Sequence, residues 1–285
     1  MKPPRFTYEA PSRLDEVLAR LAQHGEGARP LAGGQSLVPA MNLRLANPGH
    51  LIDLNRVREL RGIQVLPDGR IRVGAMTRHA ELERSELLRE CIPLIPAAMR
   101  YVAHEAIRQR GTIGGSLAHA DPAAEWSGLC WLLDATLELA SEGGTRRLSA
   151  VQFTQGVYST ALEPGELITA IEFPAWPQQR RWAFDEVSRR RGDFAIAGAM
   201  CTLDLDPEGI CQHARCVVFA ASEAPCLLDT QALLGRALTI QAVERFAREA
   251  ACTLSCLNDQ HASADYRLEL AETLTARVLR RAAQI

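Results

Sequence analysis

The sequence has almost no lysine and none of the common cofactor fingerprints. Lys2 is the only lysine among 285 residues, so a pyridoxal Schiff base, which needs a buried and positioned lysine, is not expected. The patterns G-x-G-x-x-G, G-x-x-x-x-G-K-[ST], H-E-x-x-H and G-x-S-x-G are absent. The usual dinucleotide turn, a P-loop, a zinc-protease helix and a nucleophile elbow are therefore excluded.

The eight cysteines lack the spacing of a metal centre, because none forms a C-x-x-C pair. Ferredoxin-type iron–sulfur ligation needs tighter clusters. Cys252 and Cys256 stand four residues apart, on one face of an expected helix. We interpret the cysteines as buried, reduced thiols, and we expect no iron–sulfur cluster and no metal site in this chain.

Charge and hydropathy exclude two classes of partner. The formal net charge is −2, which offers no attraction to nucleic acid or an anionic membrane. No apolar run approaches the roughly 20 residues of a membrane span, and no apolar stretch follows the first five residues as a signal peptide requires. We expect a globular protein of the cytoplasm without a transmembrane segment.

Hydrophobic spacing predicts a small parallel α/β unit at the start of the chain. A helix is expected to begin at a Ser12 cap and to end at Gly25. A strand over 29–32, a helix over 36–44 and a strand over 51–54 follow at short spacing. Strand–helix–strand order of this kind favours a parallel sheet.

The rest of the chain predicts an α+β protein. Up to residue 173 we expect a hairpin over 63–74, helices over 78–90 and 92–108, a helix from an Asp121 N-cap through Leu133, and strands near 136–140, 145–149 and 167–173. The proline-containing segment 174–181 is the expected linker. Beyond it we expect strands near 182–189, 195–205 and 214–221, then helices near 226–235, 240–254 and 265–283.

The most informative feature is a glycine-rich turn that leaves a strand and enters a helix, the run from Ala32 to Leu37. Without a Cβ, Gly33 and Gly34 let backbone N–H groups approach an anion closely. The following helix N-terminus and the Ser36 hydroxyl would add to the attraction. A diphosphate fits such a turn, and an ordinary capped strand–helix turn explains the same residues.

A second run, from Thr112 to Pro122, combines the same features. Gly114 and Gly115 are followed by Ser116 and then by the acidic helix start at Asp121. Two such loops in one chain suit a single long ligand whose two phosphates are gripped from both sides.

Three motifs, in this order along the chain, resemble the FAD-binding medium subunits of molybdenum hydroxylases, of the carbon monoxide dehydrogenase and xanthine dehydrogenase type. The matching runs are 32–39 with 51–54, 110–116 with 118–124, and 192–195 after three arginines, supported by 74–77 and 165–168.

The resemblance implies a two-lobed FAD-binding fold of the vanillyl-alcohol-oxidase type over 1–175, with lobes of about 1–57 and 58–175. A small α+β domain of the carbon monoxide dehydrogenase flavoprotein type would occupy 180–285. Extended FAD would lie between the lobes, with its diphosphate against the backbones of 32–36 and 112–116. Valine in place of Gly33 or Gly114 would then exclude FAD without harming the fold.

The resemblance also implies a set of cofactor-binding residues and no catalytic side chain. Glu125 would hold the ribityl chain, or it is an acidic residue in a first helical turn. Phe194 would lie against the isoalloxazine ring, or it packs in the core. His119 would contact the ligand or is a polar loop residue, and Asp121 would contact FAD or only cap a helix. The full set is Ala32, Gly33, Gly34, Gln35, Ser36, Leu37, Thr112, Gly114, Gly115, Ser116, His119, Asp121, Glu125 and Phe194.

Two segments depart from the family pattern. Asp185 stands where several relatives carry a lysine, so a contact of residue 185 with the flavin is in doubt. The segment 103–108 differs from the corresponding loop of the carbon monoxide enzymes, and a heterocycle or a ketone could be the substrate instead.

The function implied by the resemblance is electron relay. A large molybdopterin subunit would hydroxylate the substrate, a small [2Fe-2S] subunit would pass the electrons on, and FAD in this chain would deliver them to an external acceptor. The assembly would be a dimer of heterotrimers. A self-contained FAD oxidase of the same fold and a non-redox assembly module are the alternatives.

Overall fold

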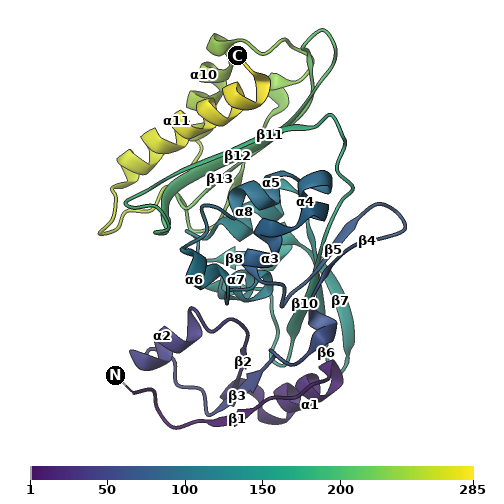
Figure 1. The fold of residues 1–285 in the computed structure, drawn as a ribbon. Helices are drawn as coiled ribbons and strands as arrows, with labels where there is room; N and C mark the ends of the chain where they lie inside the picture. Colours follow the sequence, from purple (N-terminus) through teal and green to yellow (C-terminus); the bar gives the residue numbers. More distant parts are fainter. Residues whose placement is uncertain (1) are drawn as a thin grey trace.

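Three larger β-sheets follow one another along the chain in the computed structural model, which describes residues 2–285. Figure 1 shows the N-terminal sheet at the bottom, the second sheet and its helices in the middle, and the C-terminal sheet under two helices at the top. Within residues 2–285, no helix combines the length and the apolar character that crossing a membrane requires.

The first unit is the expected parallel sheet, with strand order β1-β3-β2. Helix α1 packs on it through three buried side chains, Val17, Leu18 and Leu21. Gly25 ends α1 with φ 52°, as predicted, whereas the predicted Ser12 cap is wrong because the helix begins only after Arg13. The elements are β1 (Thr7–Glu9), α1 (Leu14–His24), η1 (Gly25–Gly27), β2 (Ala28–Leu31), α2 (Leu37–Asn42), β3 (His50–Asp53) and η2 (Arg58–Leu60).

The second unit is an antiparallel sheet of order β4-β5-β10-β6-β7, covered by short helices. Its core contains the fully buried Trp126, Phe153 and Phe173. The elements are β4 (Ile63–Val65), β5 (Ile71–Gly74), α3 (His79–Arg84), α4 (Glu86–Cys91), α5 (Leu94–Ala98), α6 (Glu105–Arg108), α7 (Ile113–His119), α8 (Glu125–Leu132), β6 (Thr136–Ser141), β7 (Gly144–Ser149), α9 (Ala150–Phe153), β8 (Thr154–Gly156), β9 (Ser159–Thr160) and β10 (Leu167–Phe173).

The helices of this unit are shorter than the sequence predicts. Ser85 ends α3 and caps α4 by accepting the Leu88 N–H, and Ala103, with φ 46°, lies in the break before α6. Asp121 does not cap α8, which begins at Glu125. Its carboxylate instead accepts the Ala123 N–H at 2.9 Å and closes a turn before the helix.

The third unit is an antiparallel sheet of order β11-β12-β13-β14. The predicted helix over 226–235 is wrong, because a two-residue strand and a 3₁₀ turn occupy it. Helix α10 ends at Ala251, so Cys252 and Cys256 do not share a helix face, and Cys252 is exposed rather than buried. The elements are β11 (Arg181–Ser188), β12 (Ala195–Leu205), β13 (Cys211–Phe219), β14 (Cys226–Leu227), η3 (Gln231–Leu233), α10 (Ile240–Ala251) and α11 (Ala264–Ala283).

The third sheet is buried on both faces. Helices α10 and α11 cover one face (Figure 1), and the other face adds Phe184, Met200 and Phe219 to the core of the second unit. Gly198 permits this packing, since a Cβ there would lie 2.1 Å from Cε1 of Phe219. The second and third units therefore share one continuous core.

Candidate cofactor site

The two glycine-rich loops are pressed against each other. A Cβ on Gly33 would lie 2.3 Å from the carbonyl oxygen of Arg110 and 2.8 Å from Cα of Gly111. A Cβ on Gly115 would lie 3.4 Å from Cβ of Ala32. The structure thus brings together two segments that the sequence only suggested would share a ligand, and Gly33 is required for backbone contact between them.

A polar bracket holds the loops together. The Asn55 side-chain amide donates to the carbonyl of Ala32 at 3.1 Å, while Arg78 donates both to Asn55 Oδ1 and to the carbonyl of Arg110. Burial, with the nearby charges of Arg61 and Arg110, lowers the pKa of Arg78, although a guanidinium remains charged in proteins. Sequence analysis missed both bracket residues, and the only available signal was the position of Asn55 just after a strand.

The first loop carries free backbone donors. Within residues 2–285, the N–H groups of Gly33, Gly34, Gln35 and Ser36 have no hydrogen-bond acceptor. Gly34 adopts φ 73°, a conformation that glycine takes without strain. Consecutive unpaired N–H groups near a fixed positive charge form a typical binding site for an anion such as a diphosphate.

The second loop has its amides occupied. The N–H of Gly114 donates to the carbonyl of Ala75 at 2.8 Å, that of Gly115 to Thr112 Oγ1 at 3.1 Å, and that of Ser116 to the carbonyl of Thr112 at 3.0 Å. The expected contact of this backbone with phosphate therefore meets no free N–H group at these three positions. The second loop supports the first and offers the hydroxyl of Ser116 rather than backbone N–H groups.

The packing also corrects the predicted effect of valine at the glycines. A Cβ on Gly114 would lie 2.6 Å from Cβ and 2.8 Å from the carbonyl oxygen of Ala75. Both Gly33 and Gly114 thus contact protein, and a larger side chain would displace the fold locally instead of only filling ligand space.

An aromatic and acidic cluster follows the second loop. The Tyr158 hydroxyl donates to Asp121 Oδ2 at 3.1 Å, and the rings of Tyr158 and His119 have centroids 5.0 Å apart. Burial and the Asp121 carboxylate raise the pKa of Tyr158. His119 and Asp121 are thus brought together, and Tyr158 is a member of the cluster that sequence analysis missed.

The third motif presents an exposed aromatic ring. Phe194 is 60% exposed, which excludes the core-packing interpretation. Gly192, with φ 87°, lies so close to His104 that a Cβ would approach its ring within 2.6 Å. The divergent segment 103–108 therefore supports the loop that carries Phe194, and an apolar ring in solvent is available for a planar ligand.

Two carboxyl groups with raised pKa values are the buried Glu125 of α8 and the partly buried Glu186 of β11. Burial, with the added charge of Asp121, raises the pKa of Glu125 to about 7. Burial, with the charges of Glu125 and Asp185, raises the pKa of Glu186 to about 8. Burial and neighbouring negative charge both favour the protonated form of a carboxyl group.

Asp185 forms ion pairs with two arginines of helix α11. Its carboxylate accepts from Arg277 at 3.0 Å and lies 3.2 Å from Nη1 of Arg281, and both arginines belong to α11. Because side chains alternate along a strand, Glu186 rather than Asp185 faces the second unit. Asp185 therefore fastens α11 to the sheet.

A surface hollow of about 550 Å³ lies near the loops and includes Asn55, the residue that holds the first loop. The hollow is lined by Ser12, Asn55, Arg56, Arg58, Glu59 and Arg61. None of the glycines of either loop lines it. The free amides, not this hollow, mark the candidate site.

Comparisons with known proteins agree with this site. Residues 4–176 match the family described as the FAD binding domain in molybdopterin dehydrogenase, and residues 182–282 match the CO dehydrogenase flavoprotein C-terminal domain. The chain belongs to the FAD-binding subunits of the molybdenum hydroxylases. Its fold is the FAD-binding fold with the C-terminal domain that the resemblance implied, and its cofactor is FAD.

The relatives of this FAD-binding subunit match along its whole length. It is 38% identical over 284 residues to the 6-hydroxypseudooxynicotine dehydrogenase complex subunit alpha of Paenarthrobacter nicotinovorans, covering 99% of this chain and 96% of that protein. It is 37% identical to the carbon monoxide dehydrogenase medium chain of Hydrogenophaga pseudoflava, covering 98% and 97%.

The solved structures agree equally well. The structure of quinoline 2-oxidoreductase from Pseudomonas putida 86 aligns with a TM-score of 0.95 at 40% identity, covering 100% of this chain and 99% of that one. A Cu,Mo-CO dehydrogenase aligns with a TM-score of 0.96 at 35% identity and the same coverage. The substrates in these names differ widely although the subunit fold is the same, so the fold does not specify the substrate.

Proposed function

We propose that this chain relays electrons through FAD, from the iron–sulfur clusters of a partner subunit to an external acceptor. The observation that carries the proposal is the row of free amides at Gly33–Ser36, in a chain whose third loop presents the exposed ring of Phe194. When bound, FAD supplies the redox chemistry, and the protein supplies binding, orientation and electrostatics. We therefore assign no acid, base or nucleophile to the chain.

The proposed contacts divide by chemistry. The backbone of Gly33–Ser36 binds the diphosphate, the ring of Phe194 packs against the isoalloxazine, and Glu125 faces the ribityl chain. The complete proposed set is Ala32, Gly33, Gly34, Gln35, Ser36, Leu37, Thr112, Gly114, Gly115, Ser116, His119, Asp121, Glu125 and Phe194. The proposed division of the chain places the FAD-binding domain at 1–175 and the C-terminal domain at 180–285.

We further propose that the chain is the medium-sized subunit of a cytoplasmic dimer of heterotrimers, together with a small [2Fe-2S] subunit and a large molybdopterin subunit. Two observations support this. Relatives are named as medium chains or complex subunits, and the eight cysteines lack the close spacing of iron–sulfur ligands, which favours a partner as the source of the clusters.

The direct test records the visible spectrum of the purified protein and identifies the proteins that co-purify with it. Purified from native cells, the chain should show bound FAD and bring down a small iron–sulfur protein and a large molybdenum protein. Turnover of a small substrate by the isolated chain would favour the self-contained oxidase. A colourless protein that FAD cannot reconstitute would favour the assembly module.

Replacing Phe194 by alanine should weaken FAD binding about 10-fold, because stacking and burial of an aromatic ring on a ligand contribute on the order of 1–2 kcal/mol. The FAD-free protein should keep its melting temperature, since an exposed side chain contributes little to stability. Flavin fluorescence titration measures the affinity. Tyr266→Ala, at an exposed aromatic of α11, is the matched control, and equal affinity in both variants would remove Phe194 from the site.

A further inference from the structure

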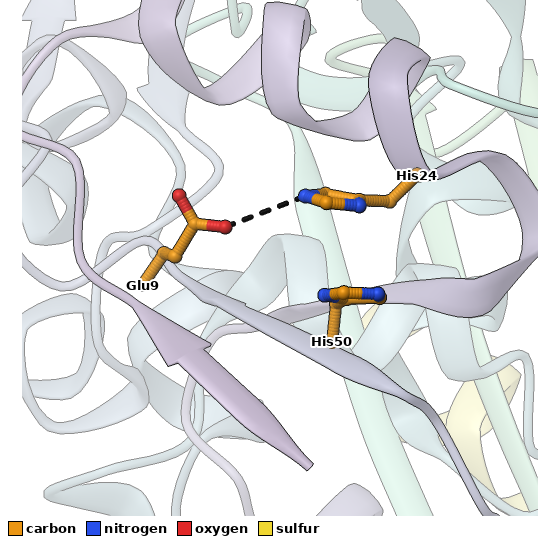
Figure 2. Close-up of side chains that lie close together, drawn as sticks. All are labelled: Glu9, His24 and His50. Atoms are coloured by element: carbon orange, nitrogen blue, oxygen red, sulfur yellow. Dashed lines mark ion pairs between the residues drawn. The ribbon is translucent and has the colours of Figure 1, made fainter.

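Three potential metal ligands meet on the first unit. They are Glu9 of β1, His24 at the last residue of α1, and His50 at the first residue of β3. One ligand atom from each lies within 4.8 Å of the other two. Figure 2 shows the two imidazole rings one above the other, each with a nitrogen on the side of the Glu9 carboxylate.

The spacing suits a tetrahedral ion better than a hydrogen bond. His24 Nε2 and Glu9 Oε1 are 3.4 Å apart, which is long for a hydrogen bond to a carboxylate. Two ligands at the usual Zn–N and Zn–O lengths of about 2.0–2.1 Å in a tetrahedron are separated by about 3.3–3.4 Å. The rings stack with centroids 3.8 Å apart and an interplanar angle of 17°, so the rings must rotate out of this stack for both to bind one ion.

The hydrogen bonds around His50 leave a nitrogen ready for a metal. Thr7 Oγ1 lies 2.6 Å from His50 Nδ1, and the same hydroxyl donates to the carbonyl of Gly49 at 3.4 Å. The short contact with the Thr7 hydroxyl therefore occupies Nδ1 of His50. Nε2 is the ring nitrogen left for an ion, and metal-binding histidines are commonly oriented by a second group that holds the other nitrogen.

Glu9 is also oriented and reachable. Arg20 Nε lies 3.0 Å from Glu9 Oε2, which leaves Oε1 turned toward His24. The side chain of His24 is 17% exposed and that of Glu9 is 35% exposed, so an ion can enter from solvent and a water can complete its coordination.

We propose that Glu9, His24 and His50 bind one divalent transition-metal ion of the Zn²⁺ type. Two imidazoles and a carboxylate form a ligand set that Zn²⁺ prefers, with a fourth position open to water. The ion joins β1, a three-residue edge strand next to β3, to the end of α1. It stabilises the N-terminal strand and takes no part in electron transfer.

The test is a Co²⁺ titration of the full chain, followed by its visible spectrum. Tetrahedral Co²⁺ should appear with one ion per chain, Zn²⁺ should displace it, and Zn²⁺ should raise the melting temperature in a concentration-dependent way. His50→Gln and His24→Gln should lose the Co²⁺ spectrum. Thr7→Val, which removes only the group that orients His50, should weaken binding about 10- to 100-fold.

His261→Gln is the matched control, because His261 is exposed and distant in the chain from the cluster, and it should bind Co²⁺ as the unaltered protein does. Absence of a stoichiometric tetrahedral Co²⁺ spectrum in the unaltered protein would overturn the proposal. So would a spectrum that survives in both His24→Gln and His50→Gln, which would place the ion elsewhere. Both results are independent of FAD.

Discussion

Gly33→Ala should cost the protein most of its bound FAD. The new Cβ would lie 2.3 Å from the carbonyl oxygen of Arg110, a distance that forces the two loops apart. Overpacking of this kind costs about 1–3 kcal/mol. Because the displaced atoms carry the free amides of the first loop, we expect FAD affinity to fall roughly 10- to 100-fold.

Equilibrium dialysis against FAD, with the melting temperature of the FAD-free chain, measures both consequences. The matched control is Gly143→Ala, whose Cβ would meet only Oγ of Ser141 at 3.6 Å, and it should retain FAD fully. Unaltered FAD affinity in Gly33→Ala would mean that the contact between the loops does not shape the site.

Glu186→Gln should flatten the dependence of stability on pH above neutrality. Burial raises the pKa values of Glu125 and Glu186 to about 7 and about 8, from 4.5. The folded chain therefore binds more protons than the unfolded chain in this range, and the free energy of unfolding falls as pH rises from about 4.5 to about 8. Between about pH 7 and pH 8.5, Glu186 alone should account for a fall of about 1 kcal/mol.

Urea unfolding at both pH values gives the slope directly. The window avoids His79, whose pKa burial lowers to about 4, because that histidine is then largely neutral in both the folded and the unfolded chain. Glu208→Gln, at an exposed position, should keep the slope of the unaltered protein. A Glu186→Gln variant with that same slope would show that the pKa of Glu186 is not raised in the folded chain.

The elements that the sequence predicted well are those with strong periodicity or clear stops. Helix α1 ends at Gly25, and strands β6, β7 and β10 lie within a residue or two of their predicted ranges. The predictions that failed concern interruptions within the predicted helices. The two helices predicted over 78–90 and 92–108 are each divided, at the Ser85 cap and at the positive φ of Ala103, and such breaks depend on tertiary packing.

The site shows the same limit. Glycines in a turn suggested an anion, but only the structure shows that the amides of Gly33–Ser36 are free while those of Gly114–Ser116 are used internally. The Arg78 bracket joins residues far apart in sequence by side-chain contacts. No spacing rule for a single segment predicts such contacts.

The continuous core between the second and third units has a consequence for how the cofactor is acquired. The ring of Phe219 packs over Gly198 in a shared interior, so the C-terminal domain cannot swing about the predicted 174–181 linker without exposing large aromatic side chains. Close-packed interiors resist such movement. The second and third units therefore move as one body, and a movement that admits FAD would have to take place between the first unit and this body.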